Sequence, residues 1–494
     1  MLRSGLKQFL AYSIGSLAQA ALGFLLLPLY LNRLTTAEYG IVSVLLTLNS
    51  VVSLVAGSGV LSGLSRLYYE QSIESRRRMA GTTIAWMCGA SMIVALLMIA
   101  ASGPLSVAFF DEAYYADEIR TASVLLLISA LQASLYVLLR LEKRAIEFVT
   151  ISIAGFLVEL ALKAYLIGTL HQGVEGYFVS SIFSATLTTL MSIAVLRGCV
   201  VLSFKHPMLR ALLTLGFPFI FTGLGMWILD ISDRLILEAF AGSELVGVYT
   251  LGYKFASVFN IVLLGPLSLF WTPFIFSFGA ERGEEAMRIA HRQAFIVLTL
   301  AGSLLLVGIS AGSADVIYMF TQNSAYYPAS RLVPFLSLAP FLYMLSYPAG
   351  SAILQSKQVR YAGYAMGAAA LINLSLNLIL IPHFSVYGAT ATTVIGYLVL
   401  CALQYYWAQR VFPAPYDWVR AIKIVGCSAL SVLVVEQVHL APPVVSFLVR
   451  EGLGVLIFIS AMWFIRGIRM TDILLVKNLA RQLITQLYAS PISH

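Results

Sequence analysis

Long apolar runs recur along almost the whole chain, and they constrain its fold more than any other feature. From Phe9 to Ile465 there are about fourteen such runs, each near the ~20 residues that an α-helix needs to cross a hydrocarbon core. Only 11% of the 494 residues are charged, against about 25% in soluble domains. The sequence therefore predicts an all-α polytopic membrane protein with about fourteen transmembrane helices, and the short connectors leave no room for a soluble catalytic domain.

Motifs of energised or catalytic membrane proteins are missing from the sequence. No Gly-Lys pair occurs, so no G-x-x-x-x-G-K-[ST] loop can hold ATP phosphates. The six histidines form no H-E-x-x-H pair, and the four cysteines lie far apart. We therefore expect a protein that is not an enzyme, with no catalytic residue, no metal, no disulfide and no cofactor, driven by a gradient or by removal of its substrate.

Cations lie mainly on one side of the predicted spans. Of the 31 Lys and Arg residues, 24 fall in the two termini and the even-numbered connectors, and three fall on the other side. The connectors in question are 63–79, 140–146, 197–211, 279–292, 355–360 and 408–423. By the positive-inside rule, both termini are cytoplasmic. The net charge of +8 is thus explained by the cations on the cytoplasmic side, and we expect no nucleic-acid partner.

An internal repeat relates the two halves of the chain. The segment 35–42 follows the first span, the similar segment 242–249 follows the seventh, and their glycines Gly40 and Gly247 are 207 residues apart. Gly176 and Gly388, before the sixth and twelfth spans, are 212 apart. Since six is an even number of spans, the copies share one orientation and form a parallel pseudo-two-fold repeat, as in many transporters. Chance recurrence of glycine after short loops is the alternative.

This repeat divides the chain into four parts. We expect an N-terminal six-helix lobe at 1–205, a C-terminal six-helix lobe at 206–412, an extra transmembrane helix pair at 413–466, and a cytoplasmic amphipathic tail at 467–494. In the tail, apolar residues follow helical spacing while cations lie off that stripe, which is typical of a helix at a membrane surface.

Several short motifs resemble those of the polysaccharide and oligosaccharide-lipid flippases of the multidrug/oligosaccharidyl-lipid/polysaccharide superfamily. The motifs are Asn32–Gly40, Arg66–Glu70, Asp233–Leu237, Val246–Tyr249 and the pair Tyr253-Lys254. The resemblance implies two six-helix lobes around a central cavity in a bacterial inner membrane. It also implies alternating access and movement of an undecaprenyl-diphosphate-linked glycan from the cytoplasmic to the outer leaflet.

Charged residues inside the spans are the candidate site residues, because each costs roughly 2.5 to 3.5 kcal/mol at a helix centre. Glu159 and Lys163 stand at i,i+4, which allows either a self-neutralising ion pair or a role in the cavity. Arg66 and Arg140 lie at inner ends of spans, where they bind substrate or simply reach the headgroups.

A second group of charges lies near the outer end of the predicted hairpin of spans seven and eight. Asp230 and Lys254 are each eight residues from that end, and Asp233 and Arg234 lie between them. One interpretation is a fully paired structural cluster. The other is that Arg234 or Lys254 turns to the cavity and attracts a diphosphate.

Helix breakers interrupt the eighth span, which is too long for one straight crossing. Gly265-Pro266 lies in its middle, and proline removes a helical hydrogen bond. We predict a hinge for motion of the lobes at Gly265 and Pro266, with a static kink as the alternative.

The sequence thus favours a flippase for lipid-linked oligosaccharide, such as an O-antigen or exopolysaccharide repeat unit. The expected partners are this glycan-lipid substrate, the bilayer and other polysaccharide assembly proteins. A cation-coupled multidrug exporter of the same superfamily is the alternative within transport. A membrane glycosyltransferase or polysaccharide polymerase is the alternative from another class.

Overall fold

Helices make up the whole architecture of the described chain. The computed structural model describes residues 24–57, 59–438, 440 and 442–465, and among these it contains no β-strand. Twelve of the helical segments are long and apolar enough to cross a membrane. The chain is thus a multi-pass membrane protein. The predicted tail at 467–494 and most of the first apolar run lie outside the described residues.

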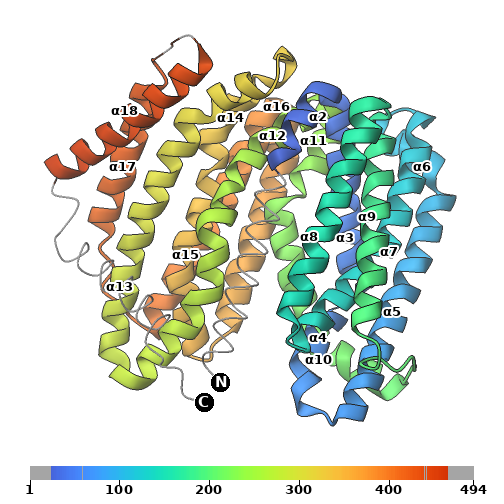
Figure 1. The fold of residues 1–494 in the computed structure, drawn as a ribbon. Helices are drawn as coiled ribbons and strands as arrows, with labels where there is room; N and C mark the ends of the chain where they lie inside the picture. Colours follow the sequence, from blue (N-terminus) through green and yellow to red (C-terminus); the bar gives the residue numbers. More distant parts are fainter. Residues whose placement is uncertain (1–23, 58, 439, 441, 466–494) are drawn as a thin grey trace, which may run out of the picture.

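The first half of the chain forms one helical bundle, shown in blue to teal in Figure 1. Its helices are α2 (Leu27–Arg33), α3 (Thr36–Gly57), α4 (Val60–Leu67), α5 (Ile73–Ala100), α6 (Ser102–Phe110), α7 (Ala116–Leu141), α8 (Ala145–Lys163) and α9 (Gly173–Val195). A π-helical turn at Ala164–Thr169 extends α8. Helices α3, α5, α7, α8 and α9 pack against one another.

The second half forms another bundle beside the first (Figure 1). It contains α10 (His206–Asp230), α11 (Asp233–Ala241), α12 (Ser243–Ala256), α13 (Gly265–Phe320), α14 (Ala329–Leu336), α15 (Leu338–Gln355), α16 (Arg360–Val411), α17 (Trp418–Val435) and α18 (Pro443–Phe464). Helix α10 contacts both α4 and α16, so it links the two bundles.

Two of the long helices are hairpins rather than straight rods. In α16 the backbone reverses at Ser385 (φ 50°, ψ −128°), and Asn373 donates to the carbonyl of Thr392 across the hairpin at 2.9 Å. In α13 the reversal is at Gly283, where φ is 84°. Helix α16 is one of the twelve segments but supplies two crossings, so the described residues hold thirteen. The reversal in α13 adds none, because its first limb continues the segment that begins at Ser243. A count of fourteen requires the first apolar run, most of which is not described.

The last two helices attach to the C-terminal bundle through α13. Arg450 of α18 donates to Asp315 of α13 at 3.2 Å, and both side chains are only 6% exposed. A buried pair of this kind is costly to break, because either charge alone would be left without compensation. Helices α17 and α18 therefore pack as part of this bundle.

The connectors rich in Lys and Arg of the first half meet at one end of the structure, which we call the basic end. There Tyr68 donates to Glu142, the N–H of Val201 donates to the carbonyl of Arg77 at 3.1 Å, and Arg144 donates to the carbonyl of Val195 at 2.8 Å. Their shared end agrees with the alternation of spans from which the topology was predicted.

At the opposite end the two bundles are held in direct contact by backbone. Helices α3 and α12 cross so closely that a Cβ atom on Gly40 would lie 1.8 Å from the carbonyl oxygen of Ser243. A Cβ atom on Gly247 would lie 2.0 Å from the carbonyl oxygen of Thr36. Glycine permits such close helix crossings because it has no side chain. The two repeat glycines thus face one another across the boundary between the bundles.

Hydrogen bonds from α2 and its following turn reinforce this closure. Asn32 donates to the carbonyl of Phe320 at 2.6 Å, and buried Tyr326 donates to the carbonyls of Leu34 and Thr35 at 3.1 and 2.9 Å. We call these bonds and the crossing of Gly40 and Gly247 the end closure. It joins the two bundles at that end of the molecule.

Labelling of single cysteines tests the predicted orientation of the basic end. In intact cells, a cysteine at Arg77, exposed at the basic end, should be shielded from impermeant thiol reagents. A cysteine at Asp117, whose side chain is 82% exposed at the start of α7, should react. Reaction at residue 77 and protection at residue 117 would reverse the topology.

Candidate functional site

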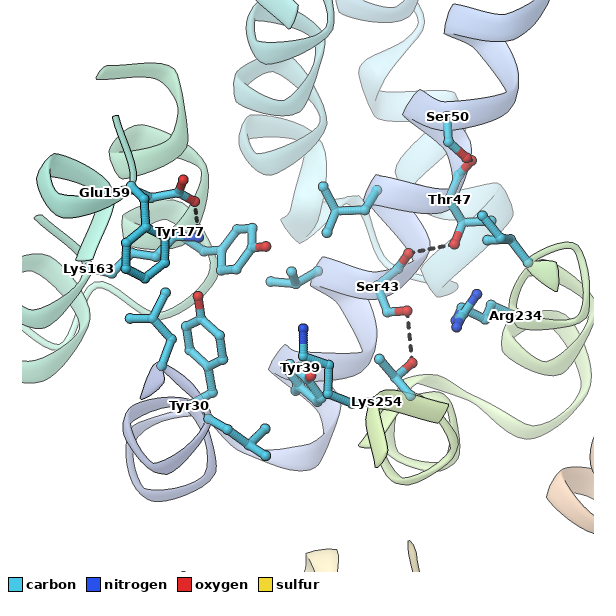
Figure 2. Close-up of a pocket in the computed structure, with 17 residues that line it drawn as sticks. Tyr30, Tyr39, Ser43, Thr47, Ser50, Glu159, Lys163, Tyr177, Arg234 and Lys254 are labelled. Carbon is cyan, nitrogen blue, oxygen red and sulfur yellow. Dashed lines mark hydrogen bonds and ion pairs between the residues drawn. The ribbon is translucent and has the colours of Figure 1, made fainter. Parts of the chain in front are cut away.

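A cavity of about 420 Å³ lies between the two bundles, next to the end closure. Its walls come from α2, α3, α8 and α9 on one side and from α11 and α12 on the other. Figure 2 shows its polar side chains converging from both bundles. The charged residues and tyrosines that line it are Tyr30, Tyr39, Glu159, Lys163, Tyr177, Arg234 and Lys254.

Glu159 and Lys163 form the ion pair that their spacing predicts. The Lys163 ammonium lies 2.5 Å from Glu159 Oε1 and 3.6 Å from the centre of the Tyr177 ring. Ser181 donates to the same carboxylate oxygen at 3.2 Å. Lys163 is only 2% exposed in its side chain, against 29% for Glu159. The lysine charge is therefore neutralised and covered, while the carboxylate remains accessible in the cavity wall.

Arg234 enters the cavity from a break between two helices. Helix α10 ends at Asp230 and α11 begins at Asp233, so Arg234 lies in the first turn of a new helix. Its guanidinium donates to the carbonyl of Asp230 at 3.3 Å and lies 4.8 Å from the centre of the Tyr253 ring. Its Nε has no hydrogen-bond partner, and no carboxylate of a described residue lies within ion-pair distance. The charge is thus buried without a direct ion pair to a described carboxylate, and the nearby carboxylates of Asp230 and Asp233 attract it only from beyond ion-pair distance.

Lys254 supplies the second cation of this wall, from the last turn of α12. Its ammonium lies 5.5 Å from the centre of the Phe24 ring, and no ion pair joins it to any described carboxylate. One turn earlier, Thr250 donates to Ser43 of α3 at 2.8 Å, which joins this part of α12 to the other bundle. Figure 2 shows Lys254 and Arg234 directed toward the same space.

The carboxylates Asp230 and Asp233 make no ion-pair contact with these cations among the described residues, and they accept hydrogen bonds from hydroxyl groups instead. Tyr253 and Tyr397 both donate to Asp230, the first at 3.0 Å. Tyr249 and Thr393 both donate to Asp233, the second at 3.0 Å. Asp230 lines a separate small pocket, within the C-terminal bundle. The four charges therefore form no ion pair with one another among the described residues: hydroxyl groups of α12 and α16 bind one oxygen of each carboxylate, while Asp233 Oδ1 is buried without a hydrogen-bond partner.

The structure places Arg66 and Arg140 outside the cavity. Each lies in the last turn of its helix, α4 or α7, near the basic end, and each is exposed. The predicted charges therefore lie in different places. Arg66 and Arg140 are at helix ends, and of the predicted charges only Glu159, Lys163, Arg234 and Lys254 line the cavity.

The predicted hinge lies beside an irregular turn. A π-helical turn at Asn260–Leu264 separates α12 from α13, which begins at Gly265 with Pro266 at its start. By the repeat interval of 207 residues, Pro266 corresponds to Gly59, where φ is 70° between α3 and α4. The second and eighth spans are therefore both interrupted at equivalent places. The repeat interval could have located the break at Gly59 from the sequence.

Comparison with solved structures identifies the fold. The fold is similar to that of the lipid II flippase MurJ in an inward closed conformation, with a TM-score of 0.72 and 15% identity over 92% of this chain and 98% of that one. It is also similar to an inward-facing multidrug resistance MATE family transporter of the MOP superfamily, with a TM-score of 0.62 and 18% identity over 81% and 94% of the two chains. A MATE transporter from Vibrio cholerae gives 0.56 and 15%, over 83% and 98%. The chain thus has the fold of MOP superfamily transporters and flippases.

The sequence places the chain in a particular family. A sequence model of the polysaccharide biosynthesis protein family matches residues 6–278, more than half of the chain. The chain belongs to this family. Comparison with curated protein sequences gave no match.

Proposed function

We propose that the protein is a flippase that moves undecaprenyl-diphosphate-linked oligosaccharide from the cytoplasmic to the outer leaflet of a bacterial inner membrane. The observation that carries this proposal is the presence of two cations, Arg234 and Lys254, in one cavity without a carboxylate partner among the described residues. A buried charge is costly unless it is paired, so the cavity favours an anionic ligand that supplies the missing partner.

A diphosphate fits these cations in chemistry as well as in charge. The planar guanidinium of arginine matches the spacing of phosphate oxygens, and the lysine ammonium adds a compact point charge. The accessible carboxylate of the cavity, Glu159, is already bonded to Lys163. The cavity thus carries net positive charge, which disfavours cationic drugs and supports the flippase over the multidrug exporter.

Alternating access assigns a role to the end closure. With Gly40 against Ser243 and Tyr326 against Leu34, the end closure joins the two bundles on the side of the cavity that the predicted topology places outside. A head group bound in the cavity reaches the outer leaflet only after these contacts separate. Because the contacts all join one bundle to the other, rocking of the bundles breaks them together.

Reconstitution tests the proposed function directly. Purified protein in liposomes that carry a fluorescent undecaprenyl-diphosphate oligosaccharide in both leaflets should make the inner-leaflet pool accessible to an external glycosidase. Liposomes without protein should expose only the outer pool. Incorporation of a labelled sugar into a longer glycan would instead indicate a glycosyltransferase or polymerase. Uptake of cationic dyes without lipid movement would indicate the drug exporter.

Straightening the eighth span should impair transport more than assembly. Alanine at Gly265 and Pro266 restores a backbone N–H and places a Cβ atom 2.9 Å from the carbonyl oxygen of Asn260, which opposes the π-helical turn. We expect glycan export to fall at least several-fold with near-normal abundance in the membrane. Unchanged export in cells, measured beside a Gly367→Ala control in open space on α16, would show that the break is a static kink.

A further inference from the structure

The N-terminal wall of the cavity carries polar groups that the proposed diphosphate site does not use. Tyr39 and Tyr177 line the cavity, and neither hydroxyl has a hydrogen bond to any described residue. Tyr30 lies between their rings, with ring centres 6.0 Å from Tyr39 and 5.7 Å from Tyr177. Figure 2 shows the hydroxyls of Tyr30 and Tyr177 pointing toward the cavity. This wall therefore offers hydroxyl groups to a ligand, while the ring faces are partly covered by one another.

Glu159 adds an acceptor to the same wall. Its carboxylate is bonded to Lys163 and Ser181, yet the side chain remains 29% exposed and lines the cavity. Because Lys163 balances the charge, the wall is close to neutral. A second phosphate would meet the carboxylate, whereas a neutral ligand with several hydroxyls could both donate to Glu159 and accept from the tyrosines.

The two walls belong to different bundles. Tyr39, Glu159 and Tyr177 come from α3, α8 and α9, and the unpaired cations come from α11 and α12. The volume of about 420 Å³ lies within the usual range of small-molecule pockets, roughly 300–1,000 Å³, and suits part of a large head group. One ligand can thus contact both bundles only if it has an anionic part and a neutral polar part side by side.

We propose that Tyr39, Glu159 and Tyr177 form a subsite for the pyranose ring attached directly to the diphosphate. This inference rests on the proposed function and adds a requirement to it. The diphosphate binds Arg234 and Lys254 of one bundle, and its first sugar binds the neutral wall of the other. A ligand shifts the equilibrium between two conformations of a protein only if it binds one of them more tightly than the other. A sugar-free prenyl diphosphate touches one wall alone, so it binds but does not drive the bundles to rearrange.

Binding of two lipids to the intact protein in nanodiscs tests this subsite. The probes are undecaprenyl diphosphate and undecaprenyl-diphosphate N-acetylglucosamine. Wild type should bind the glycosylated lipid more tightly. The Tyr39→Phe/Tyr177→Phe variant should lose roughly tenfold in affinity for it, as expected for two neutral hydrogen bonds, while its affinity for the sugar-free lipid stays unchanged. The control is Tyr165→Phe, at a side chain that is 55% exposed outside the cavity, and it should bind both lipids like wild type.

The possible outcomes separate the subsite from the proposed function. An equal loss for both lipids, or no loss for either, would overturn the sugar subsite and leave the diphosphate site standing. Failure of wild type to bind either lipid would overturn the proposed function itself. Translocation adds an independent measurement: in liposomes, wild type should move the glycosylated lipid at least tenfold faster than the sugar-free one, and equal rates would contradict the bridging of the two bundles. The single Phe variants serve where the double variant fails to assemble.

Discussion

Replacing Lys254 or Arg234 by alanine should abolish glycan export while the protein remains at normal abundance in the membrane. This is the largest effect that we expect from a single side chain in the cavity. Each cation lacks a carboxylate partner among the described residues, and hydrogen bonds to charged groups are worth about 1.5–3 kcal/mol each. Surface glycan in a strain that lacks the native gene measures the effect, and immunoblotting of membranes measures abundance.

Two further variants make this result specific. Lys357→Ala removes an exposed cation near the basic end and should leave export normal. Adding Asp230→Ala to Lys254→Ala should not restore export, because Asp230 is held by Tyr253 and Tyr397 rather than by the lysine. Restored export in the double variant would mean that Lys254 only neutralises a carboxylate, and the substrate site would have to lie elsewhere.

Leucine at Gly40 or Gly247 should prevent the end closure from forming. Even a Cβ atom would lie about 2 Å from a backbone carbonyl oxygen, and a rigid helix backbone cannot move aside as a side chain can. We expect at least a tenfold loss of export, with the cavity held open to the outside. A cysteine at Leu46, which lines the cavity and is 37% exposed, should then react with an impermeant thiol reagent in intact cells.

Gly367→Leu is the matched control, since a Cβ atom there meets no other atom within 4 Å. That variant should export glycan normally and should keep the cysteine at residue 46 protected. Normal export by the Gly40 and Gly247 variants, with residue 46 still protected, would show that the crossing is not needed for closure.

The sequence predicts the helical framework because each span is specified locally. A run of about twenty apolar residues identifies a membrane helix without knowledge of its neighbours. The spacing of Glu159 and Lys163 likewise predicts their ion pair, since residues four apart share a helix face. The hairpin reversal at Gly283 also falls within a connector expected from the charges.

The cavity depends on contacts between distant segments, and the sequence alone does not determine them. The packing of the two bundles brings four charged residues to one cavity: Glu159, Lys163, Arg234 and Lys254. No spacing along a single helix predicts this. Thr393 lies 160 residues from Asp233, and Tyr397 lies 167 residues from Asp230. No local pattern links these pairs. The hydrogen-bond partners of the two carboxylates therefore could not be predicted from the sequence.

The crossing of Gly40 and Gly247 also bears on how such a protein could be redesigned for another cargo. The atoms that meet there belong to the main chain, which every variant of the cavity shares. A side chain such as Tyr177, whose ring contacts Tyr30 and Phe178 of its own bundle, can therefore be exchanged to suit a different head group without altering this crossing, whereas Tyr39 packs against Tyr326 of the end closure. Cargo choice and gating become separable engineering problems in this scaffold.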